Sequence, residues 1–143
     1  MAGSYDQRVL PEAPEVKLGR LKEGGVAPAI MAIVDRGVRR RPHLAGGFDA
    51  EIELDMGSPY PAVRIVFQDG TVVVEDGKAQ RPDLRITGEL PDLVSLMVMP
   101  HVRGLPNPID PRGRAALGLL ASRRVKVEGK LGMLRRFLGV IQV

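Results

Sequence analysis

The chain has 143 residues, of which 44% are hydrophobic and only 3% aromatic, and it carries a formal net charge of +4 at pH 7. This length fits one domain with one core, which aliphatic side chains must fill. The absence of cysteine excludes a disulfide framework and any metal site built on thiolates. The first residues lack the basic and apolar regions of a signal peptide, and no apolar run approaches the roughly 20 residues of a membrane span. We therefore predict a cytoplasmic protein.

The first third of the chain is predicted to contain a lead-in, a helix and a strand. Residues 1–16 hold two prolines among polar residues, so we predict a flexible lead-in, followed by a single domain over residues 17–143. A helix is expected from about Pro28, because proline is favoured in the first turn and apolar residues follow at helical spacing. Pro42 should end it. Residues 48–54 then alternate apolar and acidic side chains, which predicts a strand with one buried face.

Two alternating runs on either side of Asp69 and Gly70 predict a β-hairpin. Asp-Gly is the dipeptide that a two-residue turn of this kind favours. The turn sets the pairing of the two strands: Phe67 with Val72, Ile65 with Val74, and Arg64 with Glu75. The first two pairs share an apolar face, and the third forms a cross-strand ion pair on the opposite face.

The second half of the chain is predicted to add two strands and three helices. In order these are a strand over residues 83–87, a helix opened by Pro91 and ended by Pro100, a helix over about 112–122, a strand over 124–128 and a closing helix. Four prolines in residues 100–112 indicate an extended loop between the first two of these helices. The whole order predicts an α+β fold, a five-stranded, mainly antiparallel sheet with helices packed on its apolar face.

The closing helix has an apolar side wider than packing against one surface requires. An ordinary surface helix needs a stripe of roughly 100°. Here about half of the circumference is apolar, with Leu131, Met133, Leu134, Phe137, Leu138, Val140 and Ile141. The surplus could contact a protein partner, a membrane surface or a bound lipid.

The polar residues do not form a pattern typical of catalysis. His43 and His101 lie in predicted loops without a cluster of carboxylates, and the serines lie in no nucleophile elbow. We therefore predict that the protein is not an enzyme and has no catalytic residue, metal ion or cofactor. From Pro111 onward, eight basic residues stand against one acid, but no exposed aromatic residues are interleaved for base stacking, so nucleic acid is not expected as a partner.

Four segments together resemble the sterol carrier protein type-2 domain family. They are the hairpin over residues 66–77, the strand over 81–87, the helix over 90–97, and residues 120–134, a strand that runs through a glycine into the last helix. Each motif alone is apolar alternation with a glycine. Their order and spacing carry the resemblance, which covers roughly Pro61 to Val143.

The resemblance implies an apolar cavity between the sheet and the helices, with the last helix near its mouth. It therefore implies noncatalytic binding or transfer of a fatty acid, an acyl-CoA, a sterol or a related lipid. The candidate lining residues are Met31, Ile65, Phe67, Val72, Val74, Leu93, Met97, Met133, Leu134, Phe137 and Ile141. Arg135 and Arg136 are the candidates for binding a carboxylate or phosphate headgroup.

One departure and one alternative accompany this interpretation. Residues 100–113 are longer and richer in proline than the linker usual in the family, which leaves the shape of the ligand mouth open. The alternative is a protein-interaction or dimerisation module, which would present the same apolar helix face to a partner enzyme or a second copy. Transient contact with a membrane surface is a further expectation of the lipid interpretation.

Overall fold

The computed structural model describes residues 14–98, 101–102, 105–106 and 108–141. Six strands form one sheet in the order β1-β4-β3-β2-β5-β8. Their bounds are β1 (Glu15–Leu18), β2 (Ala50–Asp55), β3 (Val63–Gln68), β4 (Thr71–Asp76), β5 (Leu84–Gly88) and β8 (Val125–Gly129). The predicted α+β fold is confirmed, with one strand more than expected.

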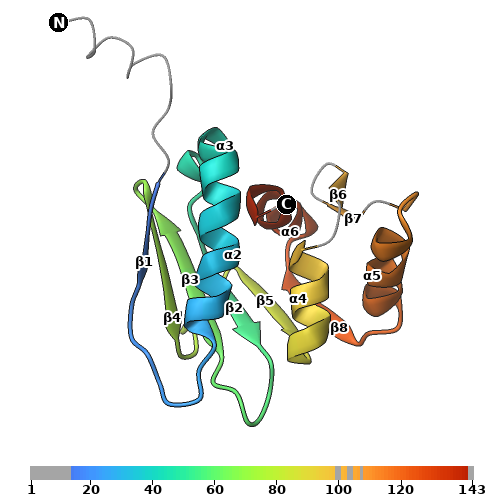
Figure 1. The fold of residues 1–143 in the computed structure, drawn as a ribbon, viewed down its shortest axis with the longest axis horizontal. Coiled ribbons are helices and arrows are strands. Elements are labelled where there is room, and N and C mark those ends of the chain that lie inside the picture. Colours follow the sequence, from blue (N-terminus) through green and yellow to red (C-terminus); the bar gives the residue numbers. More distant parts are fainter. Residues whose placement is uncertain (1–13, 99–100, 103–104, 107, 142–143) are drawn as a thin grey trace, which may run out of the picture.

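The helices form a row over one face of this sheet (Figure 1). They are α2 (Ala27–Arg40), α3 (Pro42–Gly46), α4 (Leu90–Val98), α5 (Pro111–Ala121) and α6 (Leu131–Ile141). Along the row α2 contacts α6, α6 contacts α4, and α4 contacts α5. Over the described part of the chain, no helix combines the length and the apolar character needed to cross a membrane.

The hairpin of β3 and β4 has the predicted register. Phe67 faces Val72, Ile65 faces Val74 and Arg64 faces Glu75. At the turn, φ is 51° at Asp69 and 74° at Gly70, and the two positive values are what a type I′ turn requires. A local dipeptide therefore sets which side chains of both strands face the core.

The sheet is mainly antiparallel, as predicted, because β2–β3, β3–β4 and β5–β8 pair in opposite directions. Two pairs are parallel, β1–β4 and β2–β5. After β2 the chain forms the hairpin on one side of that strand and then returns to place β5 on its other side. The β2–β5 ladder therefore joins the two halves of the sheet.

Strand β1 was missed in the sequence, and it shortens the predicted lead-in. Residues 1–13 lie outside the described part, but Glu15 and Val16 belong to β1 and pair with Thr71 and Val72. Of the four residues of β1, Val16 is the one partly buried against the core. A four-residue strand with one inward side chain leaves no alternation to detect.

The predicted loop over residues 100–112 contains a small sheet of its own. Strands β6 (His101–Val102) and β7 (Leu105–Pro106) pair antiparallel. Helix α4 ends at Val98, two residues before the expected stop at Pro100, which lies outside the described residues. Two-residue strands are below the length at which a periodic pattern can be recognised.

The core lies between the sheet and the helix row, and it contains all three phenylalanines of the chain. Phe67 is central, because its ring centroid lies 4.9 Å from that of Phe48 and 6.2 Å from that of Phe137. Helices α2 and α6 approach closely at Gly37. A Cβ at this position would lie 2.5 Å from the Ile141 Cα, so the contact depends on glycine.

The N-terminus of α2 is capped by a carboxylate from the end of β4. Asp76 is 2% exposed, and its Oδ1 accepts a hydrogen bond from the Ala27 N–H at 3.1 Å. Its Oδ2 accepts one from the Lys22 N–H at 2.9 Å. A carboxylate both satisfies a free amide and is stabilised by the helix dipole at this end. Asp76 thereby ties the first helix to the sheet.

The outer face of the sheet carries charges that alternate in sign across five strands. We call these residues the outer charge row: Glu75, Arg64, Glu53, Arg85 and Glu128, each opposite the next in the strand register. Arg64 Nη1 lies 3.0 Å from Glu75 Oε2, and Arg85 Nε lies 2.9 Å from Glu53 Oε2. Arg64 also pairs with Glu51. This face is therefore polar, unlike the face under the helices.

Burial and pairing act in opposite directions on the titration of this row. Burial disfavours the charged forms, so by itself it would lower the pKa of Arg64 and raise that of Glu75. The hydrogen bonds that Arg64 donates to Glu51 and Glu75 outweigh burial and raise the pKa of Arg64. Hydrogen bonds from the Arg20 backbone N–H and the Arg64 side chain likewise lower the pKa of Glu75. Both groups are held in their charged forms.

Candidate functional site

The side chains predicted to line a lipid cavity lie together between the sheet and the helices, where they are packed against one another. Nine of them are at most 2% exposed: Ile65, Phe67, Val72, Val74, Leu93, Met97, Leu134, Phe137 and Ile141. Met31 and Met133 are half-buried and pack against the same core. Their common inward face follows from strand and helix periodicity. Their contact with a ligand stays a prediction.

The wide apolar side of the closing helix is used mostly within the chain. Helix α6 lies over the sheet between α2 and α4, with α3 near one end (Figure 1). A helix with neighbours on both sides and a sheet beneath it buries more than a single stripe. The buried residues are Leu134, Phe137, Leu138, Val140 and Ile141. Leu131, at the start of α6, is 63% exposed.

The two headgroup candidates differ in their surroundings. Arg136 Nη2 donates a hydrogen bond to the Gly47 carbonyl at 2.9 Å, and its guanidinium carbon lies 5.1 Å from the ring centroid of Phe48. Arg136 therefore connects α6 to the segment between α3 and β2 through these two contacts. Arg135 is exposed on the same helix. Neither residue lines the pockets described below.

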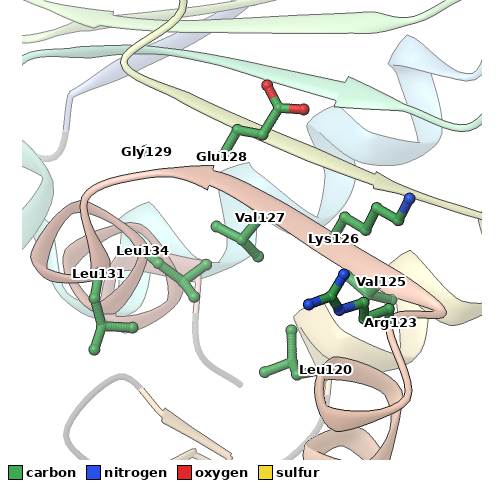
Figure 2. Close-up of a pocket in the computed structure, with 9 residues that line it drawn as sticks. All are labelled: Leu120, Arg123, Val125, Lys126, Val127, Glu128, Gly129, Leu131 and Leu134. Atoms are coloured by element: carbon green, nitrogen blue, oxygen red, sulfur yellow. The ribbon is translucent and has the colours of Figure 1, made fainter.

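A pocket of about 610 Å³ lies between the end of α5, strand β8 and the start of α6. Its lining residues are Leu120, Arg123, Val125, Lys126, Val127, Glu128, Gly129, Leu131 and Leu134 (Figure 2). Figure 2 shows Leu120, Val127, Leu131 and Leu134 on one side of β8, directed toward the space between the two helices. Lys126 and Glu128 extend from the other side of the strand. We call this space the β8 pocket.

Local backbone features shape the β8 pocket. Successive side chains of a strand point to opposite faces, so Val125 and Val127 share the inner face. Gly129 has a φ of 131°, and a Cβ there would lie 2.5 Å from the Asp83 carbonyl oxygen, which only a glycine allows. Arg123 has a φ of 64° just after α5, where the chain reverses into β8. Helices α5 and α6 thus meet β8 at its two ends.

Of the predicted cavity residues, Leu134 is the one that lines the β8 pocket. The sequence showed the inward alternation of Val125 and Val127 and placed Leu131 on the apolar arc. It did not indicate that these side chains stay accessible, because accessibility depends on how far α5 lies from α6. Leu120 belongs to the segment that carries the resemblance, but nothing in the sequence marked it as a lining residue.

A second pocket, of about 390 Å³, lies between α4 and α5. Its lining is mixed: Asp92, Ser95, Val98, Arg112, Ala115, Ala116, Leu119 and Arg124. Arg124 Nη2 lies 3.1 Å from the Asp92 carboxylate, which is 9% exposed. Leu119 faces this pocket and Leu120 faces the β8 pocket, so the end of α5 separates the two. Among the described residues, no three His, Asp or Glu side chains form a group that could hold a metal ion.

The sequence matches no family model and no curated protein. Solved structures do match the fold. A protein described as "UbiJ-SCP2 Ubiquinone synthesis protein" superposes with a TM-score of 0.58 at 15% identity, over 81% of this chain and 92% of that chain. The sterol carrier protein domain 2 of Helicoverpa armigera superposes with a TM-score of 0.51 at 16% identity, over 80% and 87% of the two chains. The chain has the sterol carrier protein type-2 fold.

The resemblance drawn from the four sequence segments is thereby confirmed at the level of the fold. The same sterol carrier fold matches part of a larger chain, the inverting sec-alkylsulfatase Pisa1 from Pseudomonas sp.. That superposition has a TM-score of 0.52 at 17% identity and covers 71% of this chain but 14% of the sulfatase. At these identities the shared property is the arrangement of helices and strands.

Proposed function

We propose that the protein is a noncatalytic lipid-binding module that takes up an apolar ligand in the β8 pocket. The ligand class is a fatty acid, an acyl-CoA, a sterol or a related lipid, and delivery involves transient contact with a membrane surface. The observation that carries the proposal is an open pocket whose aliphatic lining comes from α5, β8 and α6 in a sterol carrier fold.

The size and lining of the pocket support this proposal. A volume of about 610 Å³ falls within the range of roughly 300–1,000 Å³ that is usual for small-molecule sites. Leu131 is 63% exposed, and Val127 is half-buried. A bound acyl chain would remove their surface from water and gain roughly 25 cal/mol per Å² of apolar area.

The polar residues at the rim would set the orientation of the ligand. Arg123 is exposed and lines the pocket where the chain passes from α5 into β8, whereas Lys126 and Glu128 extend from the opposite side of the strand. We propose Arg123 as the headgroup contact in place of Arg135 and Arg136. A few polar groups beside an apolar lining are typical of sites that orient an amphiphile.

Leu134 links the β8 pocket to the cavity predicted from the sequence. It lines the pocket and is also 2% exposed as a member of the core. Phe137 lies one helical turn further along the same buried face of α6. We propose that a long acyl chain displaces Leu134 and continues toward this predicted cavity.

The proposal is tested by fatty acid uptake with matched leucine variants. Leu131→Asp places a charge at the exposed wall of the pocket and should abolish uptake of a fluorescent fatty acid. Leu44→Asp is the control, because Leu44 is an exposed leucine of α3 (41%) outside the pocket and its variant should keep uptake. Leu134 and Phe137 are unsuitable positions, since a buried charge at either would unfold the core.

Native mass spectrometry of the protein purified from cells supplies the second measurement. A co-purified lipid mass supports the proposed function. No lipid mass, together with no uptake of either a fatty acid or a sterol by the folded wild-type protein, overturns it. Unchanged uptake in a folded Leu131→Asp variant would instead move the ligand out of the β8 pocket.

A further inference from the structure

Strand β8 ends the sheet, and its outer edge is open. Within the described part of the chain, β8 has β5 as its neighbour on one side and no strand on the other. Lys126, Glu128 and Gly129 are exposed, and Val127 is half-buried. An open edge presents a row of backbone N–H and C=O groups that another strand can pair with.

The side chains of β8 are complementary to a second copy of the same strand. In an antiparallel pair related by a two-fold axis at Val127, the two Val127 residues face each other. Lys126 of each copy then lies opposite Glu128 of the other, which gives two cross-strand pairs of opposite charge. Val125 lies opposite the small Gly129. No like charges meet within the strand.

The charges also favour this register over the two registers in which the two-fold axis lies one residue away. A two-fold axis at residue 126 would place the two Lys126 side chains opposite each other, and an axis at residue 128 would do the same for Glu128. Like charges directly opposite destabilise a strand pair. Charge on an edge strand usually prevents pairing, whereas this order of charges permits one antiparallel arrangement.

The outer charge row points to the same arrangement. The row alternates in sign and ends at Glu128, which lies 3.4 Å from Arg85. In the antiparallel dimer the next position in the row is Lys126 of the second copy, so the alternation of sign continues across the junction. Within the described residues, Lys126 has no carboxylate partner in its own chain.

We propose that the protein forms a homodimer in which two β8 strands pair antiparallel around Val127 and join both sheets into one. This surface is distinct from the apolar face of α6, which is buried within the chain. The β8 pocket is lined by residues of the same strand, so the second copy would lie beside it.

The other end of the sheet provides a competing edge and therefore a control. Strand β1 carries Glu15 and Lys17 around Val16, the same kind of pattern. Its two charges already pair with each other, at 3.8 Å between Lys17 Nζ and Glu15 Oε2. None of the lining residues of the pockets described above comes from β1. The structure therefore favours β8.

Charge exchange tests the dimer and its register together. Lys126→Glu alone places two acidic side chains opposite each other in both cross-strand pairs, and Glu128→Lys alone places two basic side chains there. Each variant should weaken dimerisation by about tenfold or more, because two attractive pairs become repulsive. Mixing the two variants should restore association as a heterodimer, since both pairs are then of opposite charge. Sedimentation velocity and native mass spectrometry distinguish these species, and circular dichroism confirms that each variant is folded.

A cysteine at the two-fold axis gives an independent measurement. The chain has no cysteine, so Val127→Cys introduces a single thiol. Residues directly opposite in an antiparallel pair have Cα atoms about 4.5–5.5 Å apart, which suits a disulfide. Val127→Cys should therefore cross-link under mild oxidation, while Val16→Cys on β1 should not. A wild-type protein that stays monomeric at millimolar concentration, a mixture that fails to associate, or cross-linking through Val16→Cys alone overturns the proposal.

Discussion

The ring of Phe67 on β3 meets the ring of Phe137 on α6 nearly edge-on, with 6.2 Å between centroids and 77° between ring planes. Both side chains are at most 2% exposed. Edge-to-face pairs at this separation are favourable beyond the area that they bury. This contact joins the middle of the sheet to the middle of the helix row.

Loss of the Phe137 ring should therefore be costly. We expect Phe137→Ala to lower the free energy of unfolding by about 3–5 kcal/mol, since it removes a large buried side chain and leaves a cavity. Urea denaturation measures this change. The control is Leu131→Ala on the same helix, where the exposed position predicts a change of less than about 0.5 kcal/mol. Similar losses at the two positions would mean that α6 does not pack as described.

Two glycine-to-alanine substitutions, one where α2 contacts α6 and one in α5, are predicted to change the stability of the protein in opposite directions. Gly37→Ala would place a Cβ 2.5 Å from the Ile141 Cα and from the Val140 carbonyl oxygen, so the helices must separate. We expect a loss of about 1–3 kcal/mol. Gly118→Ala in α5 meets no atom within 4 Å and should stabilise the protein by up to about 1 kcal/mol through helix propensity. Thermal unfolding of both variants shows whether each one is stabilised or destabilised. A stabilised Gly37→Ala variant would contradict the close packing of α2 against α6.

Much of this fold could be predicted from local patterns. The hairpin register followed from Asp69 and Gly70, because a two-residue turn determines every pair after it. Strands β1, β6 and β7 were missed, since two to four residues cannot show a period. The two parallel pairs depend on contacts between distant segments, which no local pattern contains.

The candidate site was predictable as a segment but not as a surface. All lining residues of the β8 pocket fall within residues 120–134, the segment that carried the most recognisable part of the resemblance. The sequence also identified the apolar arc of the last helix. It could not divide that arc into Phe137, which is buried, and Leu131, which is exposed, because the division depends on where α2 and α4 lie.

The cap on α2 predicts that a residue of β4 stabilises the first helix. Asp76→Ala would leave the backbone N–H groups of Lys22 and Ala27 without their acceptor. We expect a loss of about 2 kcal/mol in the free energy of unfolding, by the usual cost of a lost cap and an unsatisfied donor. Asp35→Ala is the matched control, because its ion pair with Arg39 is exposed and should contribute less than about 0.5 kcal/mol. Equal effects of the two variants in urea denaturation would rule out the capping role.

The lowered pKa of Glu75 predicts how stability changes with pH. A group whose pKa is lower in the folded state contributes stability above its ordinary pKa, and this contribution is lost as the pH falls through the folded pKa. Hydrogen bonds from the Arg20 backbone and the Arg64 side chain outweigh burial and keep the Glu75 pKa below its ordinary value of 4.5. Glu75→Gln should therefore be less stable than the wild type at neutral pH, and the difference should shrink below that value. Urea denaturation over a pH series measures both proteins, and a constant difference down to acid pH would contradict the pairing.

The parallel ladder of β2 and β5 has a consequence for the way the chain folds. Residues 50–76 form β2, β3 and β4, which are joined by short connections. Contacts between residues close in sequence form quickly, so this meander can assemble early. Within the sheet, the later strands join it through pairs such as Ile52 with Leu84, which are separated by the entire hairpin. Within the described sheet β8 pairs with β5 alone, so the strand that bears the proposed dimer edge and part of the pocket wall is joined to the meander only through the closure of that longer loop.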